Sequence, residues 1–209
     1  MNLILSGGGD SKKSKGVDSL FTSLLKNNKI LYIPVAMDRI KHSDSECLIW
    51  LKGNFSLYGN FDFTLLNEEG IKEFKYEKFL DFGGVFIGGG NTYKLLKIFK
   101  ENSFDKHLVK LLTETDIPVI GGSAGAVIFG KDIETVETMD INKVNLKDLS
   151  GMNMLNNKNV WVHYRESMDK DIQKYIERSG VEVIALPEES GLYLTNDSIE
   201  PVGMIKIFK

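Results

Sequence analysis

The sequence predicts a single α/β domain over residues 1–209, with a mostly parallel central β-sheet and helices on both faces. Three observations support this. Short, almost wholly apolar segments alternate with stretches of helical periodicity, the pattern of a parallel sheet covered on both faces. Three of these segments run directly into glycine-rich turns. The length of 209 residues fits one domain better than two.

Strands and helices alternate through the first half of the chain. Apolar residues 3–5, 30–33, 61–66 and 84–87 predict strands, bounded by glycine, proline or polar residues. Apolar residues three and four positions apart predict two helices between them. Their apolar faces are Val17, Leu20, Phe21, Leu24 and Leu25 in the first helix, and Leu48, Leu51, Phe55 and Tyr58 in the second.

The second half continues this alternation. Helices are predicted around Leu95 to Phe99 and around Phe104 to Leu112, and strands at residues 117–120, 160–162 and 181–186. Between the last two strands, Ser167 is the predicted N-cap of a helix that ends at Gly180. Residues 191–195 and 202–208, around Asn196-Asp197, predict a β-hairpin that closes the fold.

The composition excludes several classes of protein. With 42% hydrophobic residues and a net charge of −3, the chain has enough apolar content for a core and no strong field for nucleic acid or an anionic membrane. No apolar run approaches the ~20 residues of a membrane span, and residues 1–5 are too short and uncharged for a signal peptide. Cys47 is the only cysteine, which excludes a disulfide framework. We therefore expect a cytoplasmic protein with Cys47 in its core.

Ser123 lies in one of three glycine-rich strand exits, where parallel sheets bind ligands. Residues 121–125, Gly-Gly-Ser-Ala-Gly, fit the G-x-S-x-G pattern between a strand and a helix, the context of a nucleophile elbow. There the serine hydroxyl projects from the sheet edge, and the amide of Ala124 faces the same space. Taken alone, the segment also fits a plain glycine-rich turn or a phosphate cradle.

A nucleophilic serine needs a base, and the chain has three histidines. His42 lies in a polar lead-in to a helix, and His107 lies at the edge of a helix face beside Lys106. Only His163 follows a strand directly, where a parallel sheet presents its site residues. A carboxylate at a third strand exit would orient it, and Glu188 and Glu189 both qualify after the strand that ends near Leu186.

The other two glycine-rich exits are less specific. Residues 88–92, Gly-Gly-Gly-Asn-Thr, let the backbone approach a reacting carbonyl closely and fit a second oxyanion donor. They also fit an anion site at a helix N-terminus, although the spacing is not that of a P-loop. Residues 6–9, Ser-Gly-Gly-Gly, suggest a dinucleotide turn, but the third glycine of G-x-G-x-x-G is missing.

These segments together resemble the dipeptidase E and cyanophycinase group of serine peptidases. Residues 86–96 match the family's signature segment, residues 122–126 match its nucleophile turn, and residues 186–188 resemble the stretch with its catalytic glutamate. The resemblance covers nearly the whole chain in the same order. It implies a class I glutamine amidotransferase-like (flavodoxin-like) fold.

The resemblance also implies the roles of the site residues. Ser123 would be the nucleophile, His163 the base and Glu188 the orienting carboxylate, with the amides of Gly90 and Ala124 as the oxyanion hole. Candidate substrate-binding residues are Asn91 and Arg165. A small peptide, in one branch an Asp-X dipeptide, would be the substrate, and no metal, cofactor, nucleic acid or membrane is expected. A monomer or a homodimer is expected.

Two departures from the family pattern concern specificity. Gly122 stands where the dipeptidase branch tends to carry a bulky aromatic residue, and the segment between Asp132 and Asn159 is not recognisable. An acidic residue that some members carry downstream of the nucleophile has only Glu137 and Asp140 as nearby candidates. Two other classes remain open: a binding or regulatory protein that has lost the chemistry, and a nucleotide-binding α/β protein.

Overall fold

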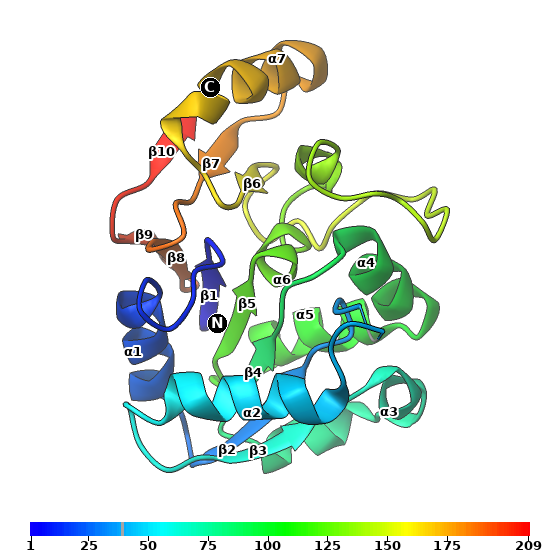
Figure 1. Ribbon diagram of the computed structural model, residues 1–209, viewed down its shortest axis with the longest axis vertical. Coiled ribbons are helices and arrows are strands. Elements are labelled where there is room, and N and C mark those ends of the chain that lie inside the picture. The colour runs from blue at the N-terminus through cyan, green and yellow to red at the C-terminus, as the bar shows by residue number, and fades with distance from the viewer. Residues whose placement is uncertain (39) are drawn as a thin grey trace.

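The computed structural model describes residues 1–38 and 40–209 (Figure 1). Within these residues a seven-stranded sheet has the order β3-β2-β4-β5-β1-β8-β9. The first five strands in this order are parallel, and the last two are antiparallel. Their bounds are β1 Leu3–Ser6, β2 Lys29–Ile33, β3 Asp62–Leu65, β4 Gly84–Ile87, β5 Val119–Gly122, β8 Gly191–Leu194 and β9 Ile199–Val202.

Helices cover both faces of this sheet, as predicted. On one face lie α1 (Lys15–Leu24) and α2 (Asp44–Phe55). On the other face lie α3 (Glu68–Glu73), α4 (Thr92–Glu101), α5 (Phe104–Glu114) and α6 (Ala124–Val127). The side chains of β1 alternate between two cores, because successive strand residues point to opposite faces. Leu3 and Leu5 pack against the α4–α6 side, and Ile4 packs against α1 and α2.

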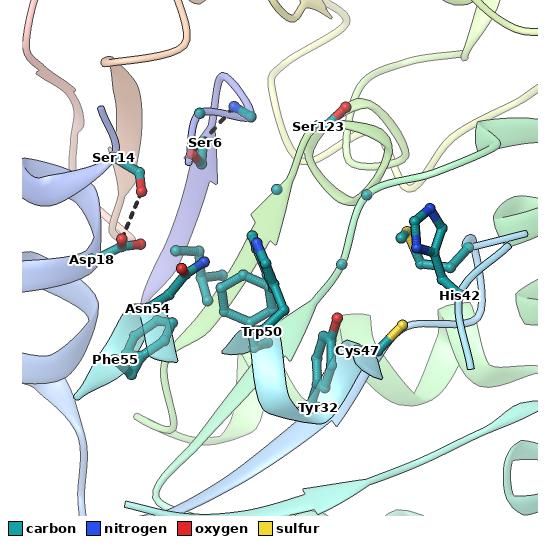
Figure 2. A pocket seen from close by; sticks show the side chains of 18 of the residues that line it. Ser6, Ser14, Asp18, Tyr32, His42, Cys47, Trp50, Asn54, Phe55 and Ser123 are labelled. Atoms are coloured by element: carbon teal, nitrogen blue, oxygen red, sulfur yellow. Dashed lines mark hydrogen bonds between the residues drawn. The ribbon is translucent and has the colours of Figure 1, made fainter. Parts of the chain in front are cut away.

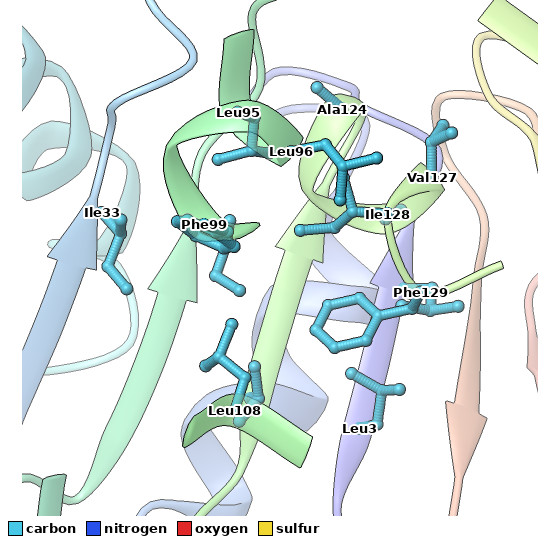
Figure 3. Close-up of a cluster of buried hydrophobic side chains, with 14 of the residues drawn as sticks. Leu3, Ile33, Leu95, Leu96, Phe99, Leu108, Ala124, Val127, Ile128 and Phe129 are labelled. Carbon is cyan, nitrogen blue, oxygen red and sulfur yellow. The ribbon is translucent and has the colours of Figure 1, made fainter. Parts of the chain in front are cut away.

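The core on the α4–α6 side holds the nucleophile turn in place. Figure 3 shows Val127, Ile128 and Phe129, from the end of α6 onward, packed near Leu96 of α4. All four side chains are fully buried. Because a close-packed interior resists movement, α6 and the turn before it are fixed against α4. Cys47 is buried in the other core, as expected.

A second, smaller sheet stands apart from the first (Figure 1). Among the described residues it has three strands, β6 (Asn159–Trp161), β7 (Val183–Ala185) and β10 (Lys206–Phe208), in the order β10-β7-β6. Helix α7 (Asp169–Ser179) packs on it through Ile172 and Tyr175. The prediction of one α/β domain with a large, mostly parallel central sheet is confirmed, but β6 and β7 lie outside that sheet.

Two local predictions need correction. Residues 191–194 form their hairpin with residues 199–202, and the chain then turns at Gly203, whose φ is 82°. Residues 206–208 leave the hairpin to pair antiparallel with β7. Ser167 is not a helix cap, because it lies in a short 3₁₀ segment, η3 (Glu166–Met168), and α7 begins at Asp169. Gly180 ends α7 in the left-handed conformation, as predicted.

Short elements between the predicted ones complete the described chain. Helix α3 and the 3₁₀ segments η1 (Tyr76–Asp81) and η2 (Glu134–Val136) were not predicted, because each is shorter than the window in which periodicity is visible.

Among the described residues, no helix has both the length and the apolar character that a membrane span needs.

Candidate active site

Ser123 lies at the sharp turn between β5 and α6. Its φ of 52° and ψ of −116° are unusual for a residue with a side chain, and such strain is typical of functional turns. The turn is tight: a Cβ on Gly121 would lie 2.1 Å from the carbonyl oxygen of Gly125. The amide of Ser123 donates to the carbonyl of Ser6 at 3.1 Å. The turn therefore has the nucleophile-elbow form that the G-x-S-x-G pattern predicts.

His163 connects the serine to a carboxylate. Its Nε2 lies 2.8 Å from Ser123 Oγ, and its Nδ1 lies 3.0 Å from Glu188 Oε1. His163 also has a positive φ of 53°, and its backbone amide donates to the carbonyl of Gly7 at 3.0 Å. The three side chains thus form a continuous hydrogen-bonded chain, with the geometry of a nucleophile, a base and an orienting group.

Glu188 is held by a second partner that sequence reasoning missed. Lys13 Nζ lies 2.5 Å from Glu188 Oε2, the oxygen that does not face His163. The hydrogen bond from Lys13 lowers the pKa of Glu188, partly opposed by burial, and the hydrogen bond to His163 lowers it further. Glu189, the alternative from the sequence, is exposed, and no described contact joins its side chain to His163. The structure therefore brings Glu188 to the histidine.

The first glycine-rich exit packs directly against the catalytic pair. Gly8 has a φ of 98°, and a Cβ there would lie 2.6 Å from His163 Cε1 and 2.9 Å from Ser123 Cβ. Only glycine fits this close approach. The amide of Gly9 donates to the carbonyl of Glu188 at 3.2 Å. The sequence signal for this role was the glycine run of residues 6–9 at a strand exit, while the pairing of β1 with β5 that brings it to Ser123 is seen only in the structure.

Two backbone amides close to Ser123 in the chain or in space have no described hydrogen-bond acceptor. Within the described residues, the amides of Gly90 and Ala124 donate no hydrogen bond. Ala124 directly follows the nucleophile, and Gly90 follows Gly89, at which a Cβ would lie 3.1 Å from Ser123 Cβ. Unpaired amides near a nucleophile are suited to stabilise an oxyanion.

The two candidate substrate-binding residues have no described contact with Ser123, His163 or Glu188. Asn91 caps α4: its Oδ1 accepts from the amide of Lys94 at 2.9 Å, and its Nδ2 donates to the carbonyl of Ile141 at 2.9 Å. Arg165 is exposed. The hydrogen bond with Glu188 raises the pKa of Lys13, and the positive charge of Arg165 opposes this rise. Neither Asn91 nor Arg165 lines the cavity beside Ser123, so their binding roles stay predictions.

A cavity of about 390 Å³ opens beside Ser123 (Figure 2), and His163 also lines it. This is within the size range of small-molecule sites. Aromatic side chains form much of its wall: Tyr32, Trp50, Phe55 and Phe86. His42 lies at this cavity, whereas His107 lies on α5 near Tyr76 and Phe104. Within residues 1–38 and 40–209, no cluster of three His, Cys, Asp or Glu side chains could hold a metal ion.

The sequence profile of peptidase family S51 matches residues 3–202. This chain belongs to peptidase family S51. The resemblance to the dipeptidase E group is thereby confirmed at the level of the family. S51 is a family of serine peptidases, and the matched residues include the strained turn at Ser123.

Two curated proteins are similar to parts of this chain. An uncharacterized peptidase of Listeria monocytogenes is 33% identical over 94 residues, covering 44% of this chain and 45% of the relative. Peptidase E of Shewanella denitrificans is 30% identical over 133 residues, covering 59% and 55%. The matched stretch thus spans about half the length of these relatives.

Solved structures match almost the whole S51 chain. A candidate peptidase E protein from Listeria monocytogenes has a TM-score of 0.73 at 22% identity, over 96% of both chains. A peptidase from an acI-B1 actinobacterium has a TM-score of 0.64 at 16% identity, over 99% of this chain and 88% of that one. At these identities the likeness establishes the fold.

Proposed function

We propose that this S51 member is a serine peptidase that cleaves a small peptide through an acyl-enzyme. The observation that carries the proposal is the hydrogen-bonded chain from Ser123 Oγ through His163 to Glu188, with distances of 2.8 and 3.0 Å. The family match and the peptidase E relatives support the same reaction class. The enzyme is proposed to act in the cytoplasm, as a monomer or homodimer, without metal or cofactor.

We propose acyl transfer in two steps, which the geometry of the site supports. His163 Nε2 takes the hydroxyl proton as Ser123 Oγ attacks the carbonyl carbon of the scissile bond. The amides of Gly90 and Ala124 donate to the resulting oxyanion. His163 then gives the proton to the leaving amine, and the C–N bond breaks. A water molecule, deprotonated by His163, releases the acyl group and restores Ser123.

Glu188 has a supporting part in this reaction. Its Oε1 faces His163 Nδ1, which fixes one tautomer of the ring and leaves Nε2 free to accept the serine proton. During the attack the imidazole becomes an imidazolium, which a nearby carboxylate stabilises. The lowered pKa of Glu188 keeps this carboxylate ionised into the acid range.

The test of the proposal is hydrolysis by the wild-type chain and by Ser123→Ala. A dipeptide and aminoacyl-amide panel with Asp, Glu, Asn, neutral and basic first residues covers the family expectation of Asp-X and its alternatives. We expect turnover in the wild type and a loss of about 10³-fold or more in Ser123→Ala, because the nucleophile is removed. Ser19→Ala, an exposed serine on α1, is the matched control and should retain full activity.

Equal turnover in Ser123→Ala and the wild type would exclude the proposal. A chain that hydrolyses nothing, and whose Ser123 does not react with a fluorophosphonate, would instead indicate a binding protein of the same fold.

A further inference from the structure

The cavity beside Ser123 extends well beyond the space that a scissile bond needs. Its lining runs from Ser123 and His163 to residues of α1, β2 and α2 on the other side (Figure 2). Tyr32, Phe55 and Phe86 are buried in its wall, while the Trp50 side chain is 47% exposed. A space of this shape, joined to the nucleophile and walled by aromatic rings, suits a long substrate side chain with an apolar stem.

Gly122 leaves space for the cavity next to the nucleophile. It precedes the nucleophile and lines the cavity. A Cβ placed on Gly122 would meet only the carbonyl oxygen of Ile87, at 3.9 Å. The volume that a side chain would occupy at position 122 therefore belongs to the cavity, directly beside the reacting serine.

Asp18 places a carboxylate in the same wall. It lies on α1, is 5% exposed, and accepts one side-chain hydrogen bond, from Ser14 Oγ to Oδ2 at 2.6 Å (Figure 2). No described residue donates to Oδ1, and that oxygen is not sealed from solvent. Burial raises the pKa of Asp18 to about 6, opposed by the Ser14 hydrogen bond. At neutral pH an ionised carboxylate, with a hydrogen bond to only one of its oxygens, thus lines an apolar cavity. This is unfavourable without a group of opposite charge.

The other charged groups of the cavity do not supply that partner. Glu46 lines the cavity and is engaged by Ser43. His42 also lines it and is exposed. Within the described part of the chain, no lysine or arginine is among the lining residues. The described lining therefore favours a cationic guest and disfavours an acidic one, because a second carboxylate beside Asp18 would be repelled.

On the basis of the proposed peptidase function, we propose that this cavity binds the side chain of the residue whose carbonyl Ser123 attacks, and that it selects lysine or arginine. The aliphatic stem would lie among Tyr32, Phe55 and Phe86, and the terminal cation would pair with Asp18. Aromatic rings around the cation would add a favourable electrostatic contact. This substrate class differs from the Asp-X peptides that the family resemblance implies.

The test compares p-nitroanilides of lysine, arginine, norleucine and aspartate in the wild type. Norleucine matches the stem of lysine without its charge. We expect kcat/KM for lysine to exceed that for norleucine by about 10- to 100-fold, the lower part of the range for close charge pairs, and aspartate to be the poorest substrate. An aspartate preference in the wild type would overturn the inference without the use of any variant.

Asp18→Asn tests the residue itself, because asparagine keeps the shape and an acceptor for Ser14. The lysine-to-norleucine ratio should fall to about one in this variant, with an unchanged thermal midpoint or a higher one as the sign of a folded chain. Asp171→Asn, an exposed acid on α7, is the matched control and should keep the wild-type ratio. An unchanged ratio in Asp18→Asn would contradict the inference.

The lysine substrate carries two cations, the side-chain ammonium and the α-ammonium. Acetylation of its α-amine shows which of them pairs with Asp18. The side-chain assignment predicts that the lysine preference and its dependence on Asp18 survive acetylation of the α-amine. Their loss on acetylation would assign the pairing to the substrate's α-ammonium and overturn the inference. Failure of the underlying function gives a different result: no turnover of any substrate and no fluorophosphonate labelling of Ser123.

Discussion

At the scale of single residues, the Glu188 carboxylate contacts both His163 and Lys13. One carboxylate oxygen faces His163 Nδ1 at 3.0 Å, and the other pairs with Lys13 Nζ at 2.5 Å. The Lys13 side chain is half exposed, so the pair itself contributes little to stability. Its effect is on protonation, because the Lys13 hydrogen bond is the largest cause of the lowered pKa of Glu188.

Lys13→Met should therefore change the pH dependence of catalysis. Without Lys13, the pKa of Glu188 rises toward its ordinary value, so Glu188 becomes protonated at a higher pH as the solution is acidified. The acid limb of the kcat/KM profile should move to higher pH, with activity at pH 8 largely retained. Lys12→Met, an exposed neighbour with no contact to Glu188, is the control. Superimposable profiles of Lys13→Met and the wild type would contradict this role.

The sequence pattern named Ser123 and His163 for the candidate site, and the family resemblance chose Glu188 over Glu189. Neither of them pointed to Lys13 or Asp18. Ser123, His163 and Glu188 each follow a strand, and parallel strands present their carboxyl ends together. Lys13 meets Glu188 across 175 residues of sequence, and no local pattern reports such a contact. Asp18 gave a weak signal, since it lies three positions before Phe21, on the buried face of α1.

At the scale of elements, the segment that sequence reasoning could not interpret is attached to the start of α4. Asp140 Oδ2 accepts from the amide of Thr92 at 2.7 Å, and the carbonyl of Ile141 accepts from Asn91 Nδ2 at 2.9 Å. A carboxylate at a helix N-terminus is favourable, because the free amides there carry partial positive charge. These contacts fix the residues that directly follow Gly90, the proposed oxyanion donor.

Asp140→Ala should loosen the loop that carries Gly90. Complete loss of one oxyanion donor costs about 10²–10³ in kcat, and we expect a smaller loss, about tenfold, because the donor is displaced rather than removed. The effect should fall on kcat more than on KM, as expected for a contact made in the transition state. Glu137→Ala, which removes only an exposed pair with Arg178, should have little effect. An equal effect of both substitutions would argue against a positioning role.

The pairing of the last strands is a part of the fold that the apolar pattern did not predict. Residues 202–208 have the apolar pattern of one strand, but the chain divides them at Gly203 between two sheets. Periodicity reports which residues are buried and not which strand becomes the partner. Helices α1, α4, α5 and α7 and the buried parallel strands of the large sheet were predicted correctly, because each has a clear apolar pattern. Helix α2 was also predicted, although its apolar pattern is weak.

At the scale of the whole molecule, the candidate site combines residues that follow strands of both sheets. Ser123 follows β5 of the large sheet, while His163 and Glu188 follow β6 and β7 of the small one. Their alignment depends on how the small sheet is fixed to the rest of the chain. Asn159, fully buried at the start of β6, donates to Asp132 and to Tyr175, each at 2.7 Å.

Asn159→Leu should destabilise the protein and lower activity together. Leucine would leave Asp132 and Tyr175 without their buried partner, at a cost of about 2–4 kcal/mol in the free energy of unfolding. Urea denaturation followed by far-UV circular dichroism measures this loss. Asn60→Ala, at an exposed asparagine before β3, is the control and should change stability by less than about 0.5 kcal/mol. A wild-type unfolding midpoint for Asn159→Leu would contradict the structural role.

The central claim, that Ser123 is an activated nucleophile, is tested most directly by fluorophosphonate labelling followed by intact-protein mass spectrometry. The proposed triad predicts one adduct per wild-type chain, located on Ser123 by peptide mapping. The adduct should be absent in Ser123→Ala and form at least about 10²-fold more slowly in His163→Gln, because the general base is lost. A wild-type chain that remains unlabelled, or an adduct that persists in Ser123→Ala, would contradict the claim.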